Sequence, residues 1–133
     1  MKLKSIIEMF FGPKKNNFSI RIFGPGEELE YKDNQVELII YMTYFNGYRY
    51  YCNSFKRDKY EKIINIDERL NIIYNLCVYF KSKNTELIFV IDENDSDKNN
   101  IIEYIETLKM NHHRLKIEIV TNKKKKKNIK SRK

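Results

Sequence analysis

Four carboxylates stand close together in the segment that follows the most apolar stretch of the chain. Asp92, Glu93, Asp95 and Asp97 come directly after the unbroken apolar run at 87–91. Such a run is typical of a central strand covered on both faces, and ligands collect at the carboxyl ends of strands in open α/β sheets. Two interpretations stay open for these acids: helix capping, or a negative patch that meets a basic partner.

The spacing of the same segment also resembles a calcium-binding loop. Asp92, Asn94, Ser96 and Glu103 stand at the first, third, fifth and twelfth positions of such a loop. The sixth position requires glycine, however, and is Asp97, and the expected element before the loop is a strand instead of a helix. We therefore expect no metal site here.

The other residues that could act as metal ligands, nucleophiles or phosphate-binding turns are few, and their spacing does not suit these roles. His112 and His113 are adjacent, so their side chains diverge on a helix or a strand, and no third metal ligand or nucleophile stands beside them. The Gly24-Pro25-Gly26 turn opens no helix and cannot cradle a phosphate. Cys52 and Cys77 lack metal-ligand or redox spacing and are expected to be buried thiols in a reducing compartment. We expect no catalytic residues, no cofactor and no metal, and hence a protein that is not an enzyme.

Aromatic residues gather around the strongest turn signal in the chain. Asn46-Gly47 predicts a two-residue hairpin, which would pair Phe45 with Tyr48. The aliphatic residues of the first strand then form the core face, and an aromatic group lies on the opposite face. Cover by another part of the chain, an exposed patch for a macromolecular partner and a base-stacking platform remain open for this group. Its members are Tyr41, Phe45, Tyr48 and Tyr50.

The net charge of the chain lies in its last eleven residues. Residues 123–133 hold eight of the 26 Lys and Arg and no acid, which leaves 18 cations against 18 acids elsewhere. We expect residues 1–121 to form a single domain and residues 122–133 to be a disordered basic tail. Nucleic acid could bind only through this tail, by counterion release and without sequence preference. The cations that would make that contact are Lys123, Lys124, Lys125, Lys126, Lys127 and Lys130.

Periodicity along the chain predicts the elements that would position these groups. The fold class is α+β: an N-terminal helix, an antiparallel β-meander with a tight Asn-Gly hairpin, then helix-strand-helix-strand packing on one face of the sheet. Asn65 is the expected N-cap of the first of these two later helices, with Glu68 as its reciprocal partner, and Asp95 or Ser96 that of the second. The expected helices span 2–11, 66–80 and about 96–111, and the strands 18–22, 28–32, 36–45, 48–54, 87–91 and 115–119.

One stretch of the sequence resembles a known family. Its pattern consists of Ser54-Phe55, Ile66, Glu68-Arg69, Ile72-Ile73, Asn75-Leu76 and Tyr79-Phe80. In this it is similar to the small immunity proteins of bacterial polymorphic toxin systems, including those of contact-dependent growth inhibition. The resemblance implies an inhibitor encoded beside a toxin that neutralises the toxin's C-terminal domain by binding it.

Three further expectations follow for such an inhibitor. A nuclease is the expected toxin, because the aromatic hairpin face together with the acids at 92–97 would suit its basic substrate cleft. No apolar run approaches the length of a membrane span, and no secretory signal is visible. We therefore expect a cytoplasmic protein that makes no membrane contact.

Overall fold

A computed structural model describes residues 17–23, 28–44, 47–81, 85–112 and 114–121 of the chain. The expected helix at 2–11 and the expected tail at 122–133 lie outside these residues. The described elements are β1 (Ser19–Phe23), β2 (Glu28–Lys32), β3 (Glu37–Tyr44), β4 (Tyr48–Tyr51), the short 3-10 helix η1 (Cys52–Phe55), α2 (Ile66–Tyr79), β5 (Leu87–Asp92), α3 (Lys98–Leu108) and β6 (Leu115–Val120).

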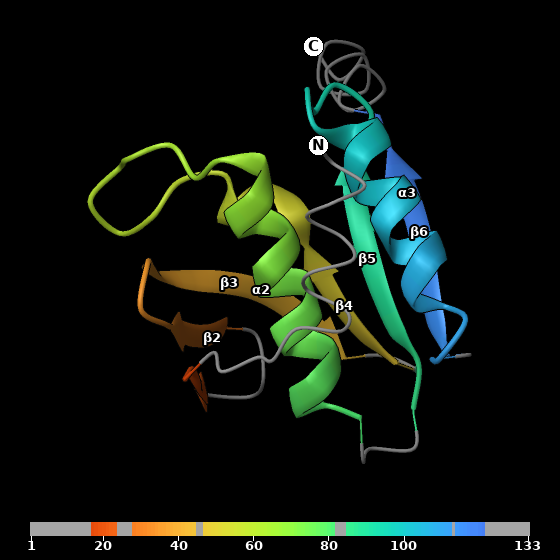
Figure 1. Ribbon diagram of the computed structural model, residues 1–133, viewed down its shortest axis with the longest axis horizontal. Helices are drawn as coiled ribbons and strands as arrows, with labels where there is room; N and C mark the ends of the chain where they lie inside the picture. The colour runs from red at the N-terminus through yellow and green to blue at the C-terminus, as the bar shows by residue number, and fades with distance from the viewer. Residues whose placement is uncertain (1–16, 24–27, 45–46, 82–84, 113, 122–133) are drawn as a thin grey trace, which may run out of the picture.

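The strands form one mixed sheet in the order β1-β2-β3-β4-β5-β6. β1 to β4 are an antiparallel meander, and β5 and β6 then run parallel to β4. α2 connects β4 to β5 and α3 connects β5 to β6, and both helices lie on the same face of the sheet (Figure 1). The sheet is strongly twisted, since β2 and β3 run across the view while β5 and β6 run along it (Figure 1). The predicted α+β class is confirmed.

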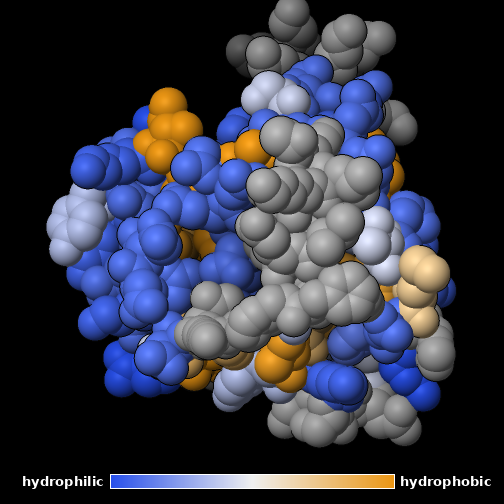
Figure 2. Space-filling view, viewed as in Figure 1, coloured by the Kyte–Doolittle hydropathy of each residue, from blue (hydrophilic) through white to orange (hydrophobic). Residues whose placement is uncertain are grey.

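β5 is the centre of the core, as its unbroken apolar sequence predicts. All six of its residues are buried. Phe89 and Ile91 face the helices, and Ile88 and Val90 face the opposite side, because successive side chains of a strand alternate. The described surface on the helix side is in contrast largely hydrophilic (Figure 2).

The hairpin between β3 and β4 differs from the predicted one. Tyr44 pairs with Tyr48 and Met42 with Tyr50, so three residues separate the strands instead of two. A shift of one residue turns every side chain of β4 to the other face. Tyr50 is therefore fully buried on the helix side beside Met42, and the half-buried Tyr48 lies on that side too.

Aromatic packing explains why this register is preferred. The rings of Tyr48 and Tyr50 lie 4.9 Å and 5.6 Å from the ring of Phe80 in centroid distance, and Tyr50 lies 5.5 Å from Phe89. Large aromatic side chains gain most from such burial. The predicted position of the aromatic group, on the face opposite the aliphatic core, was thus wrong for Tyr48 and Tyr50. Tyr41 does lie on the opposite face, 54% exposed, and Phe45 lies outside the described residues.

α2 begins where the sequence predicts. The Asn65 side chain accepts the backbone N–H of Glu68 at 2.9 Å, which satisfies one of the free donors of the first turn. The predicted apolar stripe, including Leu70, Ile73 and Cys77, is buried. Local sequence signals were therefore sufficient to predict where this helix begins and which side chains it buries.

α3 begins one to two residues later than predicted. Asp97 occupies the N-cap position and makes no side-chain capping hydrogen bond, so the expected cap at Asp95 or Ser96 was wrong. The carboxylate of Asp95 accepts the backbone N–H of Asp97, ahead of the helix, and the two terminal nitrogens of Arg69. Among the described residues, no helix combines the length and the apolarity that crossing a membrane requires.

Gly47 in the β3–β4 connection offers a direct test of this register. Its φ is +138°, and a Cβ there would lie 3.2 Å from the carbonyl oxygen of Glu86 and 3.3 Å from Cδ1 of Ile88. Gly47→Ala should lower the free energy of unfolding by about 1–3 kcal/mol, measured by urea denaturation, because alanine would be strained at this φ. Glu93→Ala, at an exposed position, is the control and should change it by less than about 0.5 kcal/mol. Equal stability of the two variants would contradict the register.

Candidate functional site

The acidic segment after β5 meets two other elements at one end of the sheet. β4 and β5 are parallel, so their carboxyl ends lie at the same edge, where α2 and α3 also begin (Figure 1). We call the polar residues gathered there the carboxyl-end cluster. It consists of Asn53, Arg69, Asp92, Asp95 and Asp97.

Arg69 is the centre of this cluster. It is 1% exposed, and its two terminal nitrogens donate to the two carboxylate oxygens of Asp95 at 2.9 Å and 2.8 Å. Nη1 also donates to Asp97 at 3.0 Å, and Nη2 to the carbonyl oxygen of Cys52 at 2.9 Å. The ring of Phe55 lies 5.7 Å from the guanidinium carbon. One side chain of α2 thus holds the end of β4 and the turn between β5 and α3.

Arg69 and Asp95 each stabilise the ionised form of the other. Burial alone disfavours the charged form of Asp95, but the hydrogen bonds of Arg69, the backbone N–H of Asp97 and the charge of Arg69 outweigh it and hold the pKa of Asp95 below its ordinary value. Burial likewise opposes the charge of Arg69, yet the hydrogen bonds and charge of Asp95 raise the pKa of Arg69. Nε of Arg69 has no hydrogen-bond partner within the part of the chain that the structure describes. The pair is therefore ionised and buried, and one buried N–H group of Arg69 lacks a hydrogen bond that would offset its loss of hydration.

Asp92 is also part of the interior. It is 5% exposed, its Oδ1 accepts the backbone N–H of Asn94 at 2.9 Å, and its Oδ2 accepts Nδ2 of Asn53 at 3.3 Å. The predicted acidic surface patch was therefore wrong for Asp92 and Asp95, because both carboxylates serve internal hydrogen bonds. Asp97 is partly exposed, and Glu93 is exposed.

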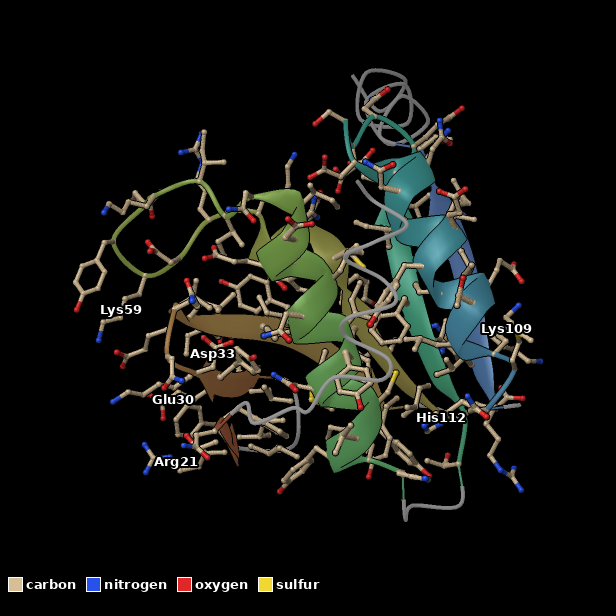
Figure 3. The ribbon with its side chains drawn as sticks, in the orientation of Figure 1. Arg21, Glu30, Asp33, Lys59, Lys109 and His112 are labelled. Carbon is tan, nitrogen blue, oxygen red and sulfur yellow. The ribbon has the colours of Figure 1, made fainter. Side chains whose placement is uncertain are left out.

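The remaining candidates for chemistry lie elsewhere. His112 is half-buried at the far end of the helices (Figure 3), beside a cavity of about 170 Å³ that Phe80 and Lys81 also line. His113 and the lysines at 123–130 lie outside the described residues. Cys52 and Cys77 are free and buried, as expected, and burial raises the pKa of each thiol to about 12. Within the described ranges no group of three or more His, Cys, Asp or Glu is arranged to hold a metal ion.

A second buried polar network, which the sequence analysis did not predict, ties the β2–β3 turn to α2. The hydroxyl of the buried Tyr31 donates to Asp33, and Nδ2 of Asn75 donates to the same hydroxyl at 2.8 Å. Burial and the neighbouring Asp33 raise the pKa of Tyr31 above its ordinary value. Asn75 and Arg69 interrupt the apolar stripe of a helix, and such polar residues are the sequence signal that could have indicated buried polar networks.

The described residues place no helix on the second face of the sheet, which we call the open face. Ile88 and Val90 of β5 are nevertheless only 7% and 4% exposed there. Nε of Arg49 on β4 donates to Glu118 on β6 at 3.1 Å. These two residues pair in register with Ile88 and Val90, so the ion pair spans β5 on this face.

Among the residues that the structure describes, Tyr41 is the most exposed large aromatic residue of the open face. Its backbone N–H donates to Oγ of Ser54 at 3.0 Å, which fixes its position although its side chain is 54% exposed. The hydroxyls of Thr43 and Tyr51, on the same face, lie 3.4 Å apart. The open face therefore combines exposed aromatic surface with hydroxyl groups and a charged pair.

Comparison of the chain with family models, with curated proteins and with solved structures finds no match. Phe55, Arg69 and Asn75, which carry part of the resemblance to immunity proteins, all occupy buried structural positions.

Removing one partner of the Arg69–Asp95 ion pair should destabilise the fold. Arg69→Met leaves Asp95 buried without its counterion and should lower the free energy of unfolding by about 3–5 kcal/mol in urea denaturation. The double variant Arg69→Met with Asp95→Leu should recover part of this loss, because it removes both buried charges. Arg57→Met, at an exposed arginine, is the control and should have little effect. If the double variant is less stable than Arg69→Met, the unpaired charge of Asp95 is not the cause of the lost stability.

The same pair predicts a pH dependence. The pKa of Asp95 in the folded state lies below its ordinary value of 3.8, so its contribution to stability is complete above that value and is lost as the pH falls through the folded pKa. The excess stability of the wild type over Asp95→Asn should be constant above about pH 5 and shrink below about pH 4. Denaturation curves at several pH values measure this excess. An excess that grows on acidification would contradict the assignment.

Proposed function

We propose that this chain is an immunity-type inhibitor, which binds and neutralises the C-terminal domain of a cognate bacterial toxin through the open face. The observation that carries the proposal is the position of Tyr41, half-exposed on a sheet face where the described residues place no helix. Tyrosine and arginine are the residues that most often dominate binding energy at protein interfaces.

The use of the carboxyl-end cluster supports a binding role over a catalytic one. Open α/β sheets commonly place substrates at this edge. Here Asp92 and Asp95 are buried and hydrogen-bonded within the protein, and Arg69 neutralises Asp95. Groups committed to holding the fold do not reach a substrate, which favours recognition at another surface.

The geometry of the open face suits a preformed interface. The Ser54 hydroxyl accepts the N–H of Tyr41 and donates to the carbonyl oxygen of Tyr51 at 2.6 Å. A side chain on a fixed backbone loses less conformational freedom on binding than one on a loose loop. Ser54 belongs to the pattern that resembles immunity proteins, and its two hydrogen bonds connect that pattern with the proposed contact surface.

A nuclease toxin fits the charge at the rim of this face. The backbone N–H of Glu93 donates to the carbonyl oxygen of Val120 at 2.7 Å, and Val120 lies on the open face opposite Asp92 in register. Glu93 is exposed directly after β5, at the carboxyl-end edge of the sheet, where its charge would steer a basic substrate cleft towards this edge.

Titration calorimetry with the C-terminal domain of the toxin encoded directly upstream tests the proposal. Tyr41→Ala should weaken the affinity about 30-fold, equivalent to about 2 kcal/mol. Tyr79→Ala is the matched control, because this tyrosine is 43% exposed on α2, in the opposite layer. Failure of the wild type to bind would exclude the proposed function, and equal affinity of the two variants would exclude the open face.

The role of the rim charge can be tested separately. Glu93→Lys should slow association with the toxin domain several-fold at low salt, and the difference should fade as the salt concentration rises. Glu106→Lys on α3 is the control, since Glu106 is an exposed acid in the helical layer. Association rates that do not distinguish these variants would remove Glu93 from the interface.

A further inference from the structure

The segment between η1 and α2 forms a small hairpin of its own. The backbone N–H of Ile64 donates to the carbonyl oxygen of Lys56 at 2.8 Å, and Arg57 and Ile63 pair as an antiparallel bridge between them. We call residues 56–64 the projecting hairpin, because this segment extends beyond the sheet and α2 (Figure 1).

Internal hydrogen bonds fix the tip of the projecting hairpin. The backbone N–H of Asp58 donates to the carbonyl oxygen of Lys62 at 2.9 Å. Oδ1 of Asp58 accepts the backbone N–H groups of Tyr60 at 2.8 Å and of Lys62 at 3.0 Å. Glu61 adopts a φ of +67°, which a residue with a side chain adopts rarely. The tip has a defined conformation although it projects into solvent.

The base of the projecting hairpin is anchored on two sides. Phe55 before it and Ile64 at its end are 0% and 3% exposed, so both belong to the core. The backbone N–H of Lys59 donates to the carbonyl oxygen of Glu37 at 2.9 Å, and its Nζ lies 3.0 Å from Oε2 of Glu37. Glu37 lies on the open face of β3, so the projecting hairpin borders that face directly.

This rigid hairpin presents two large apolar side chains to solvent. Ile63 is 74% exposed and Tyr60 is 69% exposed. Figure 2 shows apolar surface over the segment that precedes α2. Apolar anchors on a preordered backbone are the arrangement that fills a pocket on a partner at low entropic cost.

The charges around these anchors are mainly positive. The projecting hairpin holds four cations and two acids. The carboxylate of Asp58 accepts hydrogen bonds from the backbone, and Lys59 is paired with Glu37. Of the other charges, the exposed Lys56, Arg57 and Lys62 outnumber the exposed Glu61, so the net field that a partner meets is positive.

We infer that the projecting hairpin is a preformed anchor, whose Ile63 and Tyr60 fill an apolar depression on the toxin domain with carboxylates at its rim. The inference rests on the proposed function, because the occupant is that toxin domain. A nucleic acid fits less well, because an aliphatic side chain such as Ile63 offers a phosphate backbone nothing.

Kinetics by surface plasmon resonance with the same toxin domain separate the two parts of the anchor. Ile63→Ser should increase the dissociation rate at least tenfold with little change in association, because an apolar contact acts mainly after encounter. Met110→Ser is the matched control, since Met110 is 79% exposed after the end of α3. Both variants should keep the wild-type thermal midpoint.

The charge of the projecting hairpin should act on association instead. Lys62→Glu should slow association about three- to tenfold at low salt and leave dissociation nearly unchanged. Lys81→Glu, an exposed lysine just after α2, is the control. Association that is as fast for Lys62→Glu as for this control would overturn the acidic rim.

The outcomes distinguish this inference from the proposed function. If the wild type does not bind the toxin domain, both fail. If Tyr41→Ala weakens binding but Ile63→Ser dissociates like Met110→Ser, the proposed function survives and the anchor is excluded. A third outcome would overturn the inference. In it, the wild-type protein binds single-stranded RNA or phosphatidylserine vesicles, Ile63→Ser abolishes that binding, and the kinetics with the toxin domain stay unchanged. The projecting hairpin would then belong to another class of ligand.

Discussion

The buried ion pair between Arg69 and Asp95 is the interaction on which the rest of this structure depends. It joins α2 to the turn between β5 and α3, and Arg69 also donates to the carbonyl oxygen of Cys52, at the start of η1 directly after β4. Removing two charges from water is expensive, so the pair stabilises the fold only while both partners are present. The edge of the sheet where α/β proteins commonly bind ligands is therefore occupied by the protein's own side chains.

The same interaction organises the surfaces that we assign to binding. Arg69 fixes η1, and Ser54 within η1 positions the backbone of Tyr41 on the open face. Phe55, at the end of η1, packs against the guanidinium of Arg69 and anchors the start of the projecting hairpin. A continuous series of contacts thus runs from a buried charge to the open face and to an exposed apolar anchor. In the proposed function, recognition depends on the rigidity that those contacts supply.

The sequence predicts those parts of the fold that local chemistry decides. The Asn65 cap, the apolar stripe of α2 and the buried strand β5 were all confirmed, because each depends on neighbouring residues. The β3–β4 register was not predictable in this way. Asn-Gly favours a two-residue turn, but the burial of Tyr50 against Phe80 and Phe89 favours a longer connection. Asp95 was misassigned as a cap because its partner lies 26 residues earlier in the chain.

Oxidative footprinting of the complex with the toxin domain tests the central claim most directly, because it reports the side chains that a partner covers. The account predicts that Tyr41 and Tyr60 lose reactivity towards hydroxyl radicals on binding. Tyr79 and Met110, in the helical layer, should keep their reactivity and serve as internal references. Protection of Tyr79 and Met110 with Tyr41 and Tyr60 still reactive would contradict the account, since it would place the partner on the helices instead of on the open face and the projecting hairpin.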